Sequence, residues 1–175
     1  MSTFISGGCK NGKSFYAQRI AKESGTPLYY IATMIPHDSE DHARIRRHID
    51  ERDGWGFETL ECGTDILSCL DHADPNGSFL LDSVTALLSN EMFASDGFHP
   101  EAAEKIAAEL VEFAKRAPKT VFVSDFIYSD AALYDEWTET YRCGLALIDR
   151  ALARVCDRVI EVVNGQIICY KGELP

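Results

Sequence analysis

Several features that mark other protein classes are missing from this sequence of 175 residues. No apolar run approaches the roughly 18 residues that a membrane span needs, and the N-terminus lacks the basic and apolar segments of a signal peptide. The six cysteines include no CxxC pair, which argues against a zinc site and is typical of reduced thiols. We therefore expect a cytoplasmic protein with no membrane span.

Basic residues are also scarce, since 17 Lys and Arg face 28 Asp and Glu and leave a net charge of -11. That balance argues against nucleic acid as a partner, because binding the phosphate backbone needs a broad cationic surface. With 46% apolar and 26% charged residues, the composition is that of a globular chain with a substantial core. We expect one domain over residues 1–175.

Short apolar runs recur with room for helices between them, which predicts an α/β fold. The runs are STFIS, LYYIAT, FETLEC, SFLLDS, TVFVSD, RVIEVV and QIICYK, and the helices are predicted at residues 13–23, 38–53, 84–93, 100–116 and 133–156. Asn164-Gly165 joins the last two runs and favours a tight hairpin. The expected fold is P-loop NTPase-like (RecA-like): a mostly parallel sheet, helices on both faces, and a C-terminal antiparallel hairpin.

The strongest local motif is GGCKNGKS, in which Gly7, Gly12, Lys13 and Ser14 satisfy G-x-x-x-x-G-K-[ST]. Glycines let backbone N–H groups curl around an anion, and the N-terminus of the following helix adds partial positive charge. Lys13 is expected to contact the outer phosphates of a nucleoside triphosphate. The predicted phosphate-binding residues are Gly7, Gly8, Cys9, Lys10, Asn11, Gly12, Lys13 and Ser14.

A phosphate loop of this kind usually works with Mg²⁺, for which Ser14 supplies a hydroxyl ligand. Asp82, at the end of the run SFLLDS, is placed to hold the ion through water. Asp82 could instead cap the helix at 84–93, a role for which Ser83 competes. Asp125, at the end of TVFVSD, has a similar position, so either carboxylate could serve.

The stretch ARIRRHIDER, residues 43–52, places a histidine among arginines in an otherwise acidic chain. Residues 38–53 are predicted to be helical because acidic residues fill the first turn. Positions four apart share a helix face, so Arg44, His48 and Arg52 form a ridge. Like charges at this spacing disfavour the helix unless an anion, such as a nucleotide phosphate, neutralises them.

The same spacing puts Ile45 and Ile49 on an adjoining side of the helix, where we expect them to face the core. A second interpretation of the basic ridge is a solvated helix face. In that case Asp41, Asp50 and Glu51 would serve as its ion-pair partners. The pattern alone does not separate the two interpretations.

Taken in order, GGCKNGKS, YIAT and ARIRRHIDERDGWGFETLE resemble the bifunctional adenosylcobinamide kinase/adenosylcobinamide-phosphate guanylyltransferase family of cobalamin biosynthesis. That family has a GGxxSGKS-like loop, a YIAT strand and a RIxxHxxxRxxxWxTxE pattern. The matching positions of the last pattern are Arg44, Ile45, His48, Arg52, Thr59 and Glu61. The resemblance continues through FLLDSVTALLSNEMF, where Asp82 stands at a family acidic position.

The resemblance implies that His48 accepts GMP from GTP as a covalent adduct and passes it to adenosylcobinamide phosphate. Arg44 and Arg52 would then be anion clamps, and Lys13 would act on the phosphates. The resemblance also implies phosphorylation of adenosylcobinamide by a nucleoside triphosphate, GTP or ATP, and places Thr33 and Glu61 in the nucleotide site. The implied partners are a nucleotide and a corrinoid, and the implied assembly is a homo-oligomer, a trimer by family precedent.

The chain departs from the family after the TVFVSD run. Ser124 and Asp125 stand where the family has Asn and Glu, and SDFIYSDAALYDEW lacks the glycines and the proline of the family loop. Farther on, Cys143, Ala146, Asp149 and Arg150 also differ. Two alternatives therefore stay open: a small-molecule kinase without a guanylylated intermediate, and a catalytically inactive nucleotide-binding regulatory protein.

Overall fold

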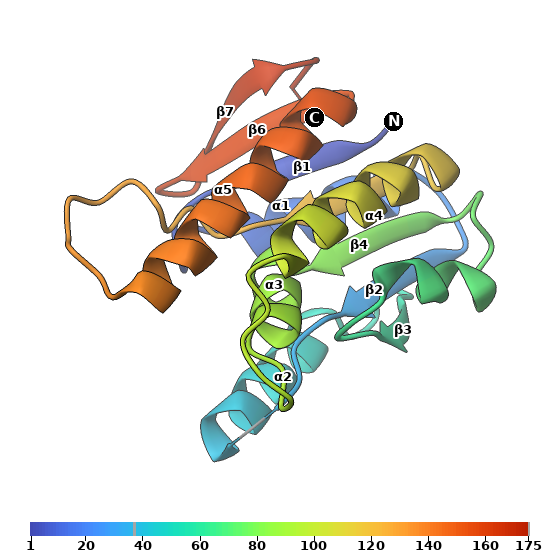
Figure 1. Ribbon diagram of the computed structural model, residues 1–175. Helices are drawn as coiled ribbons and strands as arrows, with labels where there is room; N and C mark the ends of the chain where they lie inside the picture. The colour runs from blue at the N-terminus through green and yellow to red at the C-terminus, as the bar shows by residue number, and fades with distance from the viewer. Residues whose placement is uncertain (37, 175) are drawn as a thin grey trace.

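A seven-stranded sheet with strand order β3-β2-β4-β5-β1-β6-β7 forms the centre of the molecule (Figure 1). The computed structural model describes residues 1–36 and 38–174, except for the side chains of Arg44 and Glu51. The strands are β1 (Thr3–Ser6), β2 (Leu28–Ala32), β3 (Glu58–Glu61), β4 (Ser78–Asp82), β5 (Thr120–Val123), β6 (Arg158–Val163) and β7 (Gln166–Lys171). Each predicted apolar run is confirmed as a strand.

The pairs β1–β5, β1–β6, β2–β3, β2–β4 and β4–β5 are parallel, and only β6–β7 among the strand pairs of the described residues is antiparallel. The hairpin between β6 and β7 turns at Asn164 and Gly165, whose φ values are 49° and 73°. Both lie in the left-handed region that such a turn requires. The predicted mostly parallel sheet with a C-terminal antiparallel hairpin is confirmed.

Helices cover both faces of the sheet (Figure 1). They are α1 (Lys13–Glu23), α2 (Ser39–Glu51), the 3-10 helix η1 (Ile66–Asp71), α3 (Val84–Met92), α4 (Ala102–Arg116) and α5 (Glu136–Val155). On one face, α1 packs Ala17, Ile20 and Ala21 against Val121 and Ile160. None of the helices in the described residues combines the length and the apolar content that crossing a bilayer demands.

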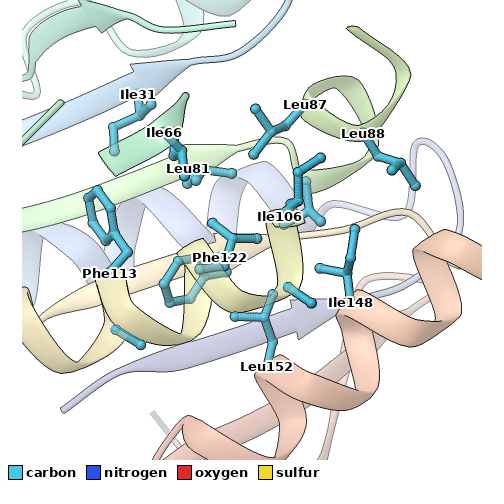
Figure 2. Close-up of a cluster of buried hydrophobic side chains, with 14 of the residues drawn as sticks. Ile31, Ile66, Leu81, Leu87, Leu88, Ile106, Phe113, Phe122, Ile148 and Leu152 are labelled. Carbon is cyan, nitrogen blue, oxygen red and sulfur yellow. The ribbon is translucent and has the colours of Figure 1, made fainter. Parts of the chain in front are cut away.

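On the other face, η1, α3, α4 and α5 bury the larger of two apolar clusters (Figure 2). Ile106 and Phe113 of α4 point toward Phe122 of β5, and Ile148 and Leu152 of α5 close the cluster from the side. All five side chains are fully buried. Burial on both faces explains why the central strands are apolar throughout instead of alternating.

Helix α2 stands apart from the sheet, at the end of the molecule where β2 and β4 finish (Figure 1). The expectation that Ile45 and Ile49 face the core is wrong: Ile45 is only partly buried and Ile49 is 50% exposed. The segment is helical as predicted, but neither residue belongs to either of the two apolar clusters of the described residues. The helix thus forms a wall over the carboxyl ends of the strands, where parallel sheets bind ligands.

Candidate functional site

The loop between β1 and α1 has the backbone shape of a phosphate loop. Gly12 directly precedes α1 with a φ of 90°, and Gly7 has a φ of 151°. A Cβ on Gly7 would lie 2.4 Å from the carbonyl oxygen of Val162, so only glycine fits there. The predicted phosphate loop is therefore present in the expected place, between a buried strand and the N-terminus of a helix.

Lys13, the first residue of α1, is only 7% exposed, and its side chain folds back over the loop. Its Nζ donates to the Gly8 carbonyl oxygen at 2.7 Å and to Asp125 Oδ1 at 2.8 Å. Asp125 follows β5, and its backbone N–H donates to Thr85 Oγ1 at 2.9 Å. These two contacts fix the ammonium group against the phosphate loop, a combination suited to binding a polyphosphate.

The end of β4 brings Asp82 to the same place. Tyr30 donates its hydroxyl to Asp82 Oδ2 at 3.1 Å, and Ser83 Oγ accepts from the Ala86 N–H at the start of α3. Ser83 is therefore the helix cap, and the alternative in which Asp82 caps α3 is wrong. Asp82 is left facing the loop, in the position of an acidic partner to the phosphate loop.

A cavity of about 720 Å³ joins the phosphate loop to α2. It is lined by Cys9, Lys10, Asn11, Gly12, Lys13, Ser14, Phe15, Gln18, Asp38, Glu40, Asp41, Arg47, His48, Trp55, Asp82, Ser83, Val123 and Asp125. A nucleotide-sized volume is therefore lined by both the phosphate loop and His48.

An aspartate cap fixes the start of helix α2, the helix that carries His48. Asp38 caps it, with Oδ1 accepting from the N–H groups of Glu40 and Asp41 at 2.8 and 2.9 Å. These acidic residues stabilise the positive end of the helix dipole. They also line the cavity beside Arg47 and His48, so this wall carries both signs of charge.

Arg52 does not line the cavity. It is 9% exposed, stacks its guanidinium at 3.6 Å on the Tyr30 ring, and donates to the His48 carbonyl oxygen at 3.1 Å and to Thr59 Oγ1 at 3.3 Å. These contacts tie the end of α2 to β2 and β3. The structure thus places Arg52 where it fixes the backbone of His48, rather than on an open ridge. The side chain of Arg44 lies outside the described residues.

Thr33 and Glu61 also lie away from the cavity lining. Thr33 is fully buried, and its Oγ1 donates to the Ser83 carbonyl oxygen at 2.8 Å and accepts from the Ser83 N–H at 2.7 Å. It therefore fixes the backbone of Ser83, the residue that follows Asp82. Glu61, at the end of β3, is exposed. Among the predicted phosphate-binding residues, Gly7 and Gly8 shape the loop without lining the cavity.

Several lining residues were not predicted: Arg47, Trp55, Gln18 and the acidic wall of α2. Arg47 directly precedes His48 in the basic stretch. It was not predicted because the ridge was defined by residues four positions apart, and adjacent residues point to different sides of a helix. A wide cavity can reach more than one ridge of a helix. Trp55 is held over the site by Lys22, whose Nζ lies 4.9 Å from the ring centre, a contact that no sequence spacing predicts.

A buried carboxyl group lies near Asp125. Asp149 of α5 is 3% exposed and accepts from the Tyr128 hydroxyl at 2.9 Å. Burial raises the pKa of Asp149 to about 7, the nearby Ser124 hydroxyl and the hydrogen bond from Tyr128 lower it, and the charge of Asp125 raises it further. Near neutral pH this carboxyl group therefore gains or loses a proton close to the carboxylate that holds Lys13.

We expect Asp149→Asn to change how stability depends on pH. An aspartate with an ordinary pKa of 3.8 when unfolded and about 7 when folded binds an extra proton in the folded state between these values. Folding stability therefore falls as pH rises from about 4 to 7 and levels off above. As pH rises from 4 to 8, the free energy of unfolding of the variant should increase relative to that of the native chain by on the order of 3 kcal/mol.

Urea unfolding across this pH range measures the difference. Asp71→Asn, at an exposed aspartate, is the matched control. Its free energy of unfolding should change with pH in the same way as that of the native chain. A stability difference between Asp149→Asn and the native chain that stays constant with pH would contradict the assignment of a raised pKa to Asp149.

Oxygen ligands near the loop determine which ion the site could take. No cluster of three or more His, Cys, Asp or Glu side chains that could hold a metal occurs in the part of the chain that the structure describes. Ser14 and Asp82 both line the cavity and offer hard oxygen donors. This set fits Mg²⁺, which usually takes one or two protein carboxylates and completes its shell with phosphates and water.

Comparison with known proteins adds independent findings. The family model "Cobinamide kinase / cobinamide phosphate guanyltransferase" matches residues 3–169. The chain is 30% identical over 175 residues to the "Bifunctional adenosylcobalamin biosynthesis protein CobP" of Pseudomonas aeruginosa, covering 99% of each chain. It is also 30% identical over 178 residues to the protein of the same description named CobU from Salmonella typhimurium, covering 94% of this chain and 97% of that one.

The fold also resembles a solved structure of an ATPase domain. The TM-score is 0.51 with 12% sequence identity, covering 91% of this chain and 68% of that chain. At that identity the likeness concerns the fold alone. It agrees with the predicted P-loop NTPase-like architecture.

Proposed function

This chain belongs to the cobinamide kinase / cobinamide phosphate guanyltransferase family, and we propose that it carries out the guanylyl transfer through a covalent GMP adduct on His48. The enzyme acts in cobalamin biosynthesis and uses nucleoside triphosphates, as a member of this family. The observation that carries the His48 assignment is the single cavity that contains both the histidine and the phosphate loop. Both reactions would then use one site in one domain.

In the guanylyl half-reaction, a ring nitrogen of His48 would attack the α-phosphorus of GTP. A nitrogen–phosphorus bond forms, the bond to the β-phosphate breaks, and pyrophosphate leaves. A phosphate oxygen of adenosylcobinamide phosphate would then attack the same phosphorus and release His48. Covalent catalysis of this kind splits one transfer into two displacements at a single site.

Charges around the cavity support this route. The phosphate loop and Lys13 would hold the outgoing phosphates, while Arg47 would stabilise charge on the phosphorus nearest His48. We assign Arg47, which lines the cavity, the anion-clamp role that the resemblance gives to Arg52. Arg52 would act indirectly instead, since its bond to the His48 carbonyl oxygen and its stacking on Tyr30 fix the end of α2.

In the kinase half-reaction, the hydroxyl group of adenosylcobinamide would attack the γ-phosphorus of the triphosphate. Ser14 and Asp82 would hold Mg²⁺, which supplies charge neutralisation on the phosphates when bound. Asp125 keeps Lys13 over the loop at 2.8 Å and lies at the end of β5, where an acceptor hydroxyl would approach. Asp82 and Asp125 are thus the candidates for orienting that hydroxyl group.

Assembly and location are also proposed on family grounds. A homo-oligomer, and a trimer in particular, is compatible with the exposed apolar surface near α5, where Leu133 is 100% and Trp137 60% exposed. The corrinoid acceptor and the cytoplasmic location likewise remain predictions. Sedimentation velocity of the purified chain measures the assembly directly.

The two half-reactions can be separated with labelled GTP. Label in the α-phosphate should appear on the protein and then on adenosylcobinamide phosphate, whereas label in the γ-phosphate should appear on adenosylcobinamide. Label that reaches adenosylcobinamide only from the γ-position, with none on protein or product from the α-position, would indicate a kinase without a guanylylated intermediate.

A further inference from the structure

A second cavity, of about 330 Å³, lies away from the nucleotide site. Its lining includes Thr3 and Arg158, the first residues of β1 and β6, and Glu23, the last residue of α1. Lys13, at the other end of α1, lines the nucleotide cavity. The two cavities therefore lie at opposite ends of the same helix.

The second cavity contains an arginine at a position where the strand pattern calls for an apolar side chain. Arg158 is paired with Thr3 in the parallel ladder between β1 and β6. Because side chains alternate along a strand, Arg158 shares a sheet face with Ile160, two residues on. Thr3 likewise shares that face with Ile5. Both isoleucines belong to the apolar cluster beneath α1, so Arg158 stands at the end of a core row.

The polar atoms of Arg158 and Thr3 are buried without protein partners. Arg158 is 9% exposed and Thr3 is 1% exposed. Within the described residues, neither Arg158 Nε nor Thr3 Oγ1 has a hydrogen-bond partner, and no carboxylate forms an ion pair with Arg158. Glu23, the acidic residue of the cavity wall, pairs with Arg19 at 2.9 Å instead. Since an unpaired buried charge is costly, an anion bound in this cavity would stabilise the guanidinium group.

The walls of the cavity restrict which anion fits. A guanidinium group is planar and matches the two oxygens of a carboxylate. One arginine beside the carboxylate of Glu23 suits a ligand with a single negative charge better than one with several. Ile20 and Leu174 add apolar surface to the lining. The volume is at the lower end of the range for small-molecule sites.

We propose that this cavity binds a small monocarboxylate with an apolar body, and that the carboxylate pairs with Arg158. The apolar body lies against Ile20 and Leu174, and the ligand contacts the last turn of α1. The site is separate from the nucleotide cavity, so the proposal does not depend on the proposed guanylyl transfer.

The test is an NMR titration of the native chain with hexanoate, with hexanamide as the neutral counterpart and inorganic phosphate as a second anion. The Nε–H resonance of Arg158, assigned by through-bond experiments, reports on the site. We expect hexanoate to shift this resonance until it saturates, and hexanamide to leave it unchanged. In Arg158→Gln, hexanoate binding followed at the backbone amide of Thr3 should weaken by about tenfold or more, the loss expected for a charged hydrogen bond.

Arg116→Gln is the matched control, because Arg116 is exposed at the end of α4, on the other face of the sheet from α1. It should bind hexanoate as the native chain does. The proposal is wrong if hexanoate leaves the Arg158 resonance unshifted, if hexanamide shifts it equally, or if Arg158→Gln binds as tightly as the native chain. Tighter binding of phosphate than of hexanoate would also contradict it. The titration of the native chain decides the matter even where Arg158→Gln fails to fold.

Discussion

Replacing Lys13 with alanine should lower the turnover of both phosphoryl and guanylyl transfer by about a hundredfold or more, the loss expected when a fixed donor to transferring phosphates is removed. The reason lies in the arrangement of the loop, where Lys13 is 7% exposed and held by Gly8 and Asp125. Lys10, the other lysine of the loop, is exposed and does not replace an ammonium group fixed at that point. Steady-state assays with GTP and each corrinoid acceptor measure the loss.

Lys115→Ala is the matched control for the charge change, since Lys115 is exposed at the end of α4 on the far side of the sheet from α1. Its activity should equal that of the native chain. We expect Lys13→Ala to fold, because the side chain of Asp125, which loses its ion-pair partner, is 22% exposed and can still contact water. Thermal unfolding checks this. A folded Lys13→Ala enzyme with native turnover would contradict the assignment of the phosphate loop.

His48→Ala should lower the rate of guanylyl transfer by about a thousandfold or more, while the rate of the kinase reaction stays close to that of the native chain. The separation is expected because His48 lies on α2, whereas the phosphate loop, which we propose serves both reactions, lies between β1 and α1. Removing the nucleophile leaves nothing to receive GMP. Parallel assays on adenosylcobinamide and adenosylcobinamide phosphate measure the two rates.

His42→Ala is the control in the same helix, since His42 is exposed and is not among the residues lining the cavity. It should retain both activities. If His48→Ala lost the kinase reaction as fully as the guanylyl transfer, His48 would be required for shape or nucleotide binding rather than as the nucleophile.

Much of the fold could be predicted because local patterns and tertiary structure agree. The strands followed from apolar runs that fit a buried parallel sheet. Helix α5 begins later than residue 133 because the Asp135 carboxylate caps it by accepting from the N–H groups of Trp137 and Thr138, both at 3.0 Å. The helix η1 was not predicted, since its six residues are too short for a periodic pattern.

The site shows where sequence spacing stops being informative. The phosphate loop was predicted because its chemistry needs glycines and a lysine at fixed positions in one continuous stretch. The ridge of α2 was predicted as a helix face, but spacing cannot say what lies opposite it. Arg52 stacks on Tyr30 of β2 and donates to Thr59 of β3, whereas Arg47 lines the cavity. These contacts depend on elements far from α2 in the sequence, which helical spacing does not encode.

We propose that His48 carries GMP during the reaction. Intact-protein mass spectrometry after incubation with GTP and Mg²⁺, without acceptor, detects such an adduct. We expect a gain of one GMP that is acid-labile, is released by adenosylcobinamide phosphate, and is absent from His48→Ala but present in His42→Ala. A native chain that binds GTP and gains no mass, or an adduct that persists in His48→Ala, would contradict it.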